Sequence, residues 1–304
     1  MMNRAALVAL LQLLPALAIA QPTDLPRTPW GHPDLQGIWD QTTGTPLERA
    51  PELGAREFLT EEEATARETE RFQAFDESPR PGSAGNYGSQ WRDGSRNALT
   101  RTSLIVDPPD GRIPTLTAAA QAQLEARQRS RRDHPADSWV DRGLWERCLT
   151  RGVPRLPNNY NSNILILQTP DVVVLLNEMI NETRVVHLDR RPHIESTIRL
   201  WNGDSRGYWE GDTLVIESSN FDDKQIFRGF PVGALRLVER LTRIGPDQID
   251  YRMTLTDPRI YSRPWTVVLP MTQSEGPIFE YACHEGNLGM KGILAGHRAD
   301  EALQ

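Results

Sequence analysis

The half of the chain after Pro157 is a succession of short β-rich segments, and their spacing limits the fold more than any other feature. Eight segments are rich in branched and aromatic residues and are separated by Gly, Pro, Asn or Asp: residues 163–169, 172–179, 184–188, 213–218, 235–244, 248–256, 265–271 and 278–285. Connections this short leave little room for crossover helices, so most strands must pair antiparallel. The spacing therefore predicts a mainly β domain, either a closed barrel or a sandwich.

The region before these segments has a different composition. Residues 21–157 are rich in Pro, Gly and charge, with helical patterns at 61–75 and 117–132 and a short strand pattern at 102–106. Thr60 followed by Glu63 has the form of a capping box, which marks the start of the first helix. We therefore expect an antiparallel meander closed into a lipocalin-like barrel over residues 158–304. The extended, partly helical region 21–157 is expected to pack on this barrel.

The N-terminus has the pattern of a secretory signal peptide. Arg4 precedes an apolar run at residues 5–17, and Ala18 and Ala20 supply the small residues of a cleavage site. Residues 1–20 therefore predict export to the periplasm or to the outside of the cell. No later segment has the roughly 20 apolar residues that a membrane-spanning helix requires.

Charge restricts the partners that the chain can bind. The 304 residues carry a formal net charge of −7. The chain therefore lacks the excess of basic residues that is expected of a nucleic-acid-binding protein. A small-molecule ligand or substrate is therefore the expected partner, with no nucleic acid and no membrane span. The sequence does not indicate an oligomeric state.

Cys148 and Cys283 are the only two cysteines of the chain. In an oxidising compartment such a pair predicts a disulfide, and two free thiols are the alternative. A bridge would place residues 139–148 beside the last β-rich segment.

This last segment carries the main candidates for catalysis. In a strand over residues 278–285, Glu280 and His284 would share one face. On the wall of a barrel pocket they would form a general acid–base pair, whereas on an outer face they would be solvated charges. Glu178 is a second candidate carboxylate, either paired with an arginine such as Arg184 or holding a raised pKa.

Polar and aromatic residues on the predicted loops are candidates for binding a substrate. Residues 203–216 predict a β-hairpin with its turn at 210–212, and this hairpin places charged groups at the mouth of a barrel. Amide, phenol and guanidinium groups orient polar molecules and stabilise developing negative charge, and tryptophans stack on sugar or aromatic rings. The candidate substrate-binding residues are Tyr160, Asn159, Arg184, Asp204, Arg206, Trp209 and Lys224.

No cofactor is predicted. The histidines His32, His187, His193 and His284 are scattered, and neither a zinc-binding His or Cys spacing nor a His-Glu-x-x-His motif is present, so a catalytic metal is the minority interpretation. The nucleophile elbow of serine hydrolases, the phosphate-binding loop and the dinucleotide fingerprint are also missing from the sequence. Of the types of catalysis considered, general acid–base chemistry by Glu and His is the one that the sequence still allows.

Three motifs carry a family resemblance. They are PWGHPDLQGIWD at residues 29–40, GDS followed by WEGDTLV at residues 203–215, and EYACHEGN at residues 280–287. With these motifs the chain resembles a family of uncharacterised secreted bacterial proteins along nearly its whole mature length. The resemblance implies no reaction, but it implies that the N-terminal motif and the barrel form one unit.

Three functions agree with these observations. The first is a secreted or periplasmic, cofactor-independent lyase or hydrolase, in which Glu280 and His284 act on a small polar, sugar-like or aromatic molecule. The second is a lipocalin-type protein that binds a small molecule without catalysis, and the third is a structural module of the cell envelope. The direction of Glu280, into a hydrated cavity or into solvent, discriminates between the first and the others.

Overall fold

The computed structural model describes residues 25–77, 88–89, 100–156 and 160–303. The expected signal peptide, residues 1–20, and the candidate Asn159 lie outside the described residues. Among the helices that are described, none combines the length and the apolar character needed to cross a bilayer.

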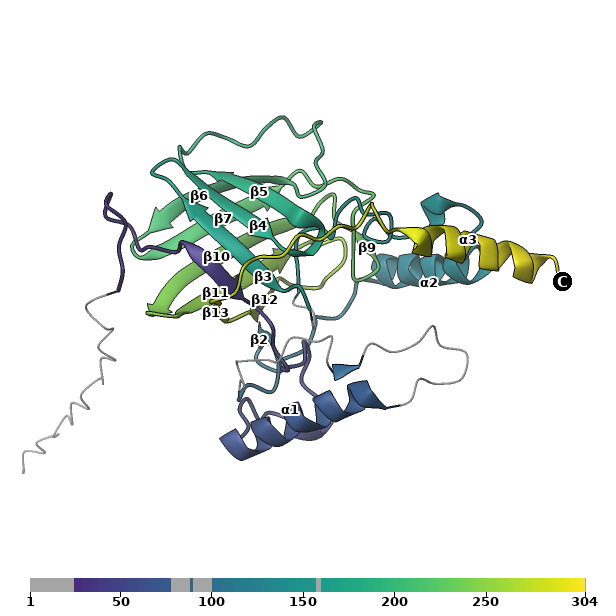
Figure 1. Ribbon diagram of the computed structural model, residues 1–304, viewed down its shortest axis with the longest axis horizontal. Coiled ribbons are helices and arrows are strands. Elements are labelled where there is room, and N and C mark those ends of the chain that lie inside the picture. Colours follow the sequence, from purple (N-terminus) through teal and green to yellow (C-terminus); the bar gives the residue numbers. More distant parts are fainter. Residues whose placement is uncertain (1–24, 78–87, 90–99, 157–159, 304) are drawn as a thin grey trace, which may run out of the picture.

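Nine strands close into a mixed β-barrel (Figure 1). Their order around the ring is β10-β7-β6-β5-β4-β3-β1-β13-β11, and pairing of β11 with β10 closes it. The strands are β1 (Gly37–Asp40), β3 (Asn163–Gln168), β4 (Val172–Asn177), β5 (Glu182–His187), β6 (Asp204–Glu210), β7 (Thr213–Ser219), β10 (Arg236–Gly245), β11 (Gln248–Thr256) and β13 (Met271–Gln273). The predicted closed barrel is confirmed in this general form.

The remaining elements lie outside the ring. β12 (Trp265–Val268) pairs with β11 and with β2 (Ile105–Asp107), and β8 (Ile226–Phe227) forms a short hairpin with β9 (Phe230–Pro231). The α-helices are α1 (Glu61–Asp76), α2 (Ala118–Asp133) and α3 (Leu288–Glu301). Short 3-10 helices are η1 (Pro51–Leu53), η3 (Trp139–Asp141) and η4 (Met179–Asn181). Figure 1 shows α2 and α3 extending from one end of the barrel.

Alternation along the long strands produces the core. In β11 the side chains of Ile249, Tyr251, Met253 and Leu255 are buried, as the period-2 pattern of this segment predicts. Buried residues also alternate along β10, but there Glu239 and Arg243 join the apolar side chains. The barrel interior therefore contains charged groups among its aliphatic packing.

The N-terminal motif belongs to the barrel. β1, which the sequence analysis did not predict, pairs with β3 and β13, and its Trp39 is fully buried. The Trp39 indole donates to the carbonyl of Leu35 at 2.8 Å. Gln168 of β3 accepts from the Leu35 amide at 2.9 Å and donates to the Pro33 carbonyl at 3.0 Å.

The segment from Arg27 to His32, which enters this motif, contacts the β6–β7 hairpin. The hairpin has its turn at residues 210–212, as predicted, and Gly211 there has a φ of 57°, in the left-handed region that favours glycine. Arg27 donates to both carboxylate oxygens of Asp212, at 3.0 and 2.8 Å. The rings of His32 and Trp209 stack with centroids 4.6 Å apart. Trp209, expected to bind substrate, therefore contacts the N-terminal segment.

Local sequence signals place the two predicted helices correctly. Thr60 accepts from the Glu63 amide at 3.2 Å and its own amide donates to the Glu63 side chain at 2.7 Å, which is the expected capping box. Thr117 caps α2 by accepting from the Ala120 amide at 3.1 Å. Helix α3 was not predicted.

Three parts of the predicted β architecture are wrong in detail. Residues 278–285 form no strand, so the shared face of Glu280 and His284 does not exist. Residues 265–271 divide into β12 and β13 at Pro270, which has no N–H to donate to a neighbouring strand. β5 and β6 pair in parallel through His187 and Arg206, because the long connection of residues 188–203 returns the chain in the same direction.

Candidate functional site

The interior of the barrel holds a buried ion pair. Arg184 of β5 donates to both carboxylate oxygens of Glu239, one of them at 2.8 Å, and Tyr251 also donates its hydroxyl to Glu239. Glu239 is fully buried. Burial and the charge of Glu239 raise the pKa of Tyr251, so the phenol remains a neutral donor. Arg184, predicted to bind substrate or to pair with Glu178, neutralises Glu239 instead.

Little free space remains beside this ion pair. A cavity of about 20 Å³ lies between Arg184, Glu239 and Tyr251 and the polar side chains of Gln41 and Asn177. This volume accommodates about one water molecule. This cavity is too small for a ligand of the size that lipocalins enclose.

Glu178 has a structural environment. It is 1% exposed, and its two carboxylate oxygens accept from the Asn163 side chain at 2.8 Å and from the Phe279 amide at 3.1 Å. The pairing with Arg184 expected from the sequence is therefore wrong. The contact with Phe279 holds the C-terminal segment against the end of the barrel.

Glu280 and His284 lie in solvent. Both side chains are exposed, and the irregular backbone of residues 278–285 does not direct them toward the barrel interior. Their placement corrects the expectation of a Glu–His pair on the wall of an enclosed pocket. Side chains two or four residues apart share a face only in a strand, and residues 278–285 do not form one.

Asp204 and Arg206 form a second polar cluster on β6. Asp204 accepts from the His193 ring at 2.7 Å and from the Ile194 amide at 3.2 Å, and it pairs with Arg206 at 2.9 Å. These contacts fix the connection between β5 and β6. Tyr160 is half-buried at the start of the segment leading to β3, outside this cluster.

A cleft of about 670 Å³ lies outside the barrel. It lies between α2, the segment of residues 139–151 and the chain around β8 and β9. Its volume falls in the range of about 300–1,000 Å³ typical of small-molecule sites. Among the predicted substrate-binding residues, Lys224 lines it. We call it the arginine cleft, after the residues that line it.

Cations outnumber carboxylates in the arginine cleft. Seven cations line it, namely Arg127, Arg131, Arg142, Arg147, Arg151, Arg228 and Lys224, against the three carboxylates Asp141, Glu146 and Asp223. In the described part of the chain, ion pairs engage Arg142 with Glu146 and Arg228 with Glu48, but not Arg127, Arg131 or Arg147. The cleft therefore carries a positive charge that its own carboxylates do not balance.

Arg127 shows this imbalance most clearly. The residue is half-buried on α2, and burial together with the nearby charge of Arg131 lowers its pKa. A guanidinium nevertheless stays protonated in proteins. Arg127 therefore keeps its positive charge in an environment that disfavours it. An anion bound in the arginine cleft would relieve it.

Two exposed tryptophans complete the walls. Trp139 is 54% exposed and Trp145 is 47% exposed, although large aromatic side chains are usually well buried. The guanidinium of Arg147 lies 4.4 Å from the Trp139 ring centroid, and that of Arg151 lies 5.2 Å from the Trp145 ring centroid. Each pair offers a cationic group and a flat apolar surface side by side.

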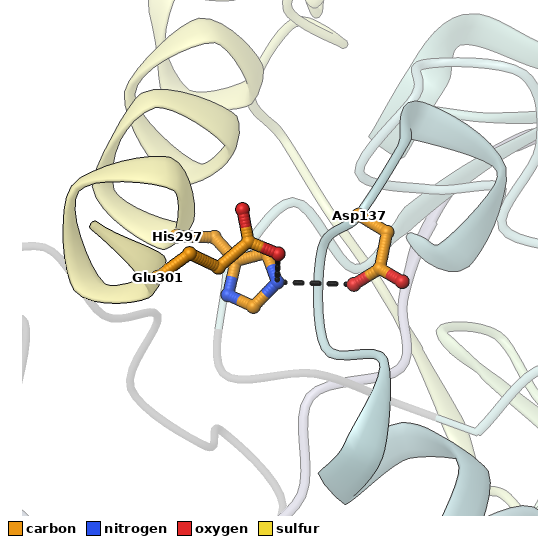
Figure 2. Close-up of side chains that lie close together, drawn as sticks. All are labelled: Asp137, His297 and Glu301. Carbon is orange, nitrogen blue, oxygen red and sulfur yellow. Dashed lines mark hydrogen bonds and ion pairs between the residues drawn. The ribbon is translucent and has the colours of Figure 1, made fainter. Parts of the chain in front are cut away.

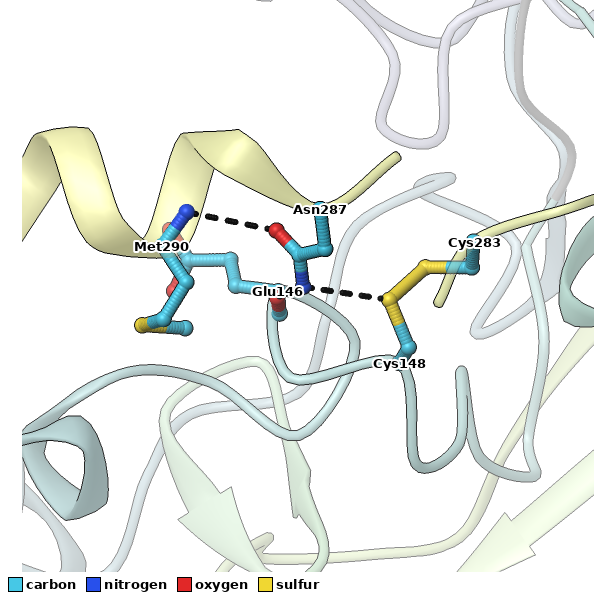
Figure 3. The surroundings of a disulfide bond; sticks show 5 residues. All are labelled: Glu146, Cys148, Cys283, Asn287 and Met290. Carbon is cyan, nitrogen blue, oxygen red and sulfur yellow. Dashed lines mark hydrogen bonds between the residues drawn. A yellow bond between two sulfur atoms is a disulfide. The ribbon is translucent and has the colours of Figure 1, made fainter. Parts of the chain in front are cut away.

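The predicted disulfide between Cys148 and Cys283 is confirmed and holds one wall of the arginine cleft (Figure 3). The Asn287 side chain, close to this bridge, donates to the Glu146 carbonyl at 3.0 Å and to the Cys148 sulfur at 3.3 Å. Its oxygen accepts from the Met290 amide at 3.2 Å, which caps α3. The wall and the start of α3 are thereby joined.

Most residues of the arginine cleft were not predicted from the sequence, because they come from separate segments without a motif. A usable signal was present in residues 139–151, where two tryptophans and three arginines lie close to Cys148. Knowing the cysteine pairing would have directed attention to this segment.

No protein-family model matches the sequence, and no curated protein is significantly similar to it.

Proposed function

We propose that this protein binds a small anionic molecule with an aromatic or sugar-like ring in the arginine cleft. The observation that carries the proposal is the excess of arginines beside two exposed tryptophans in a hollow of about 670 Å³. Guanidinium groups bind carboxylate and phosphate oxygens through two parallel hydrogen bonds. The tryptophan faces offer a stacking surface for the ring of the same ligand.

The signal-peptide pattern of residues 1–20 and the Cys148–Cys283 bridge support a periplasmic or secreted location for this function. The ligand would then be a molecule that is present in the periplasm or outside the cell. A lyase or hydrolase activity stays a prediction from the sequence. Glu280 and His284 do not line the arginine cleft, so binding without catalysis is the simpler proposal.

The test is a binding screen with purified protein. Titration calorimetry and tryptophan fluorescence would compare four probes: an aromatic carboxylate such as benzoate, a uronate, an aromatic alcohol without charge, and inorganic phosphate. We expect the ring-bearing anions to bind and to perturb the tryptophan emission. Binding should weaken with added salt, because exposed charges are screened over about 10 Å at 0.1 M.

Substitution of Arg127 separates a specific site from a general surface charge. Losing one charge-assisted hydrogen bond costs about 1.5–3 kcal/mol, so Arg127→Gln should raise Kd for the best anion about 10-fold or more. Arg129→Gln is the matched control, because Arg129 is exposed on the same helix but does not line the arginine cleft. Trp139→Ala should weaken the ring-bearing anions and leave phosphate binding almost unchanged.

Two results would overturn the proposal. One is the absence of binding by every ring-bearing anion in the screen. The other is an equal Kd for the Arg127→Gln and Arg129→Gln variants, which would show that net charge alone attracts the probe.

A further inference from the structure

His297 and Glu301 lie one turn apart on the same face of α3, and both point to Asp137, which follows α2 in the chain (Figure 2). The His297 Nε2 atom is 3.0 Å from Asp137 Oδ1 and 3.4 Å from Glu301 Oε1. The three ligand atoms all lie within 4.8 Å of one another. One imidazole nitrogen and two carboxylate oxygens therefore converge from two segments that are distant in the sequence.

The two separations from His297 agree with the coordination sphere of a small divalent cation. Zinc binds nitrogen and oxygen ligands at about 2.0–2.1 Å, so the edge of its tetrahedron is about 3.3 Å. The two distances from His297, 3.0 and 3.4 Å, lie on either side of this value. Imidazole together with carboxylate is also a ligand set that suits zinc and its first-row neighbours.

His134 holds the carboxylate in position. Its Nδ1 lies 2.7 Å from Asp137 Oδ2, the oxygen that His297 does not contact. A hydrogen bond to the second oxygen of a ligating carboxylate is the usual outer-sphere support of a metal site. Asp137 therefore has one oxygen fixed by His134 and the other directed toward α3.

Helix α3 is held to the rest of the described chain by few contacts, which a bound cation could strengthen. None of the residues of α3 is buried, and Leu288 at its start is 77% exposed. In the described structure, polar contacts hold this helix to the rest of the chain through Asn287 at its start and His297 near its end. A cation between His297, Glu301 and Asp137 would replace weak, solvent-exposed contacts by coordination bonds.

The geometry points to a zinc-type divalent metal site formed by Asp137, His297 and Glu301, with His134 as a positioning residue and a fourth position for water. Binding of the metal fixes the C-terminal part of α3 against the segment that follows α2. The inference is independent of the proposed function, because none of these four residues lines the arginine cleft.

The test uses the full mature protein without a polyhistidine tag, dialysed against a chelator and then titrated with Zn²⁺ or Co²⁺. We expect one metal ion per chain by calorimetry, and visible absorption bands of Co²⁺ in a low-symmetry site. His297→Ala and Glu301→Gln should each weaken binding about 10-fold or more, and His134→Ala about 10-fold with the stoichiometry unchanged. His187→Ala, which changes a histidine on β5, is the control and should bind as the wild type does.

Hydrogen exchange gives a second measurement that does not depend on affinity. Zn²⁺ should slow amide exchange in the last turns of α3 in the wild type and not in His297→Ala. The His297→Ala and Glu301→Gln variants should both fold, because α3 contributes no buried residue. The inference is overturned if Zn²⁺ does not bind stoichiometrically, or if His297→Ala binds it as tightly as the His187→Ala control.

Discussion

Glu239→Gln is expected to lower the free energy of unfolding by about 3–5 kcal/mol, one of the two largest effects that we predict for a substitution in this chain. Glu239 is fully buried and accepts hydrogen bonds from Arg184 and Tyr251. Its neutralisation leaves the Arg184 guanidinium buried in the barrel without a counter-charge. Urea denaturation followed by tryptophan fluorescence and circular dichroism measures the change.

Two further variants separate the ion pair from general effects of substitution. Glu217→Gln on β7 is the control, because Glu217 is exposed and accepts one hydrogen bond from Tyr208, so its change should stay within about 1 kcal/mol. The double substitution Arg184→Met with Glu239→Leu should recover most of the lost stability, since apolar packing replaces both charges. A Glu239→Gln protein as stable as Glu217→Gln would contradict the prediction.

Removal of the disulfide is expected to have the second large effect. The bridge links residues 135 positions apart. In the chain-entropy model a loop of about 100 residues contributes about 4.7 kcal/mol, so the Cys148→Ser, Cys283→Ser double variant should lose several kcal/mol of stability. The segment from Phe279 onward should also become more accessible, because Cys283 ties it to the wall of the arginine cleft.

The measurement combines thermal unfolding with limited proteolysis. We expect a lower Tm for the double variant and early cleavage between the barrel and α3. Wild-type protein treated with reductant is the control and should reproduce both changes. A double variant with an unchanged Tm would show that the bridge contributes nothing to folding stability.

Local signals in the sequence were sufficient for most individual elements. The capping box of Thr60 and Glu63, the alternation of Ile249 to Leu255 and the turn at Gly211 each depend on residues close in the chain. Such signals predict the helices, most strands and the general barrel correctly. They act through backbone geometry and short-range hydrogen bonds, which a sequence pattern represents directly.

Long-range contacts were beyond these signals. Arg184 was paired with the wrong carboxylate because Glu178 is near in sequence, whereas its partner Glu239 comes from a strand across the barrel. The convergence of His297 with Asp137 depends on how α3 docks, and the arginine cleft depends on three separate segments. Glu280 and His284 were misplaced because the disulfide and the cap of Asn287 shape a region that resembles a strand in composition.

The pairing of β1 with β13 has a consequence for the order of folding. These strands come from opposite ends of the polypeptide, so the ring stays open until residues 271–273 have left the ribosome. Contacts between such distant segments make folding slow and leave unpaired strand edges accessible in the meantime. The edges of β1 and its neighbours are therefore open to aggregation until the last strand arrives.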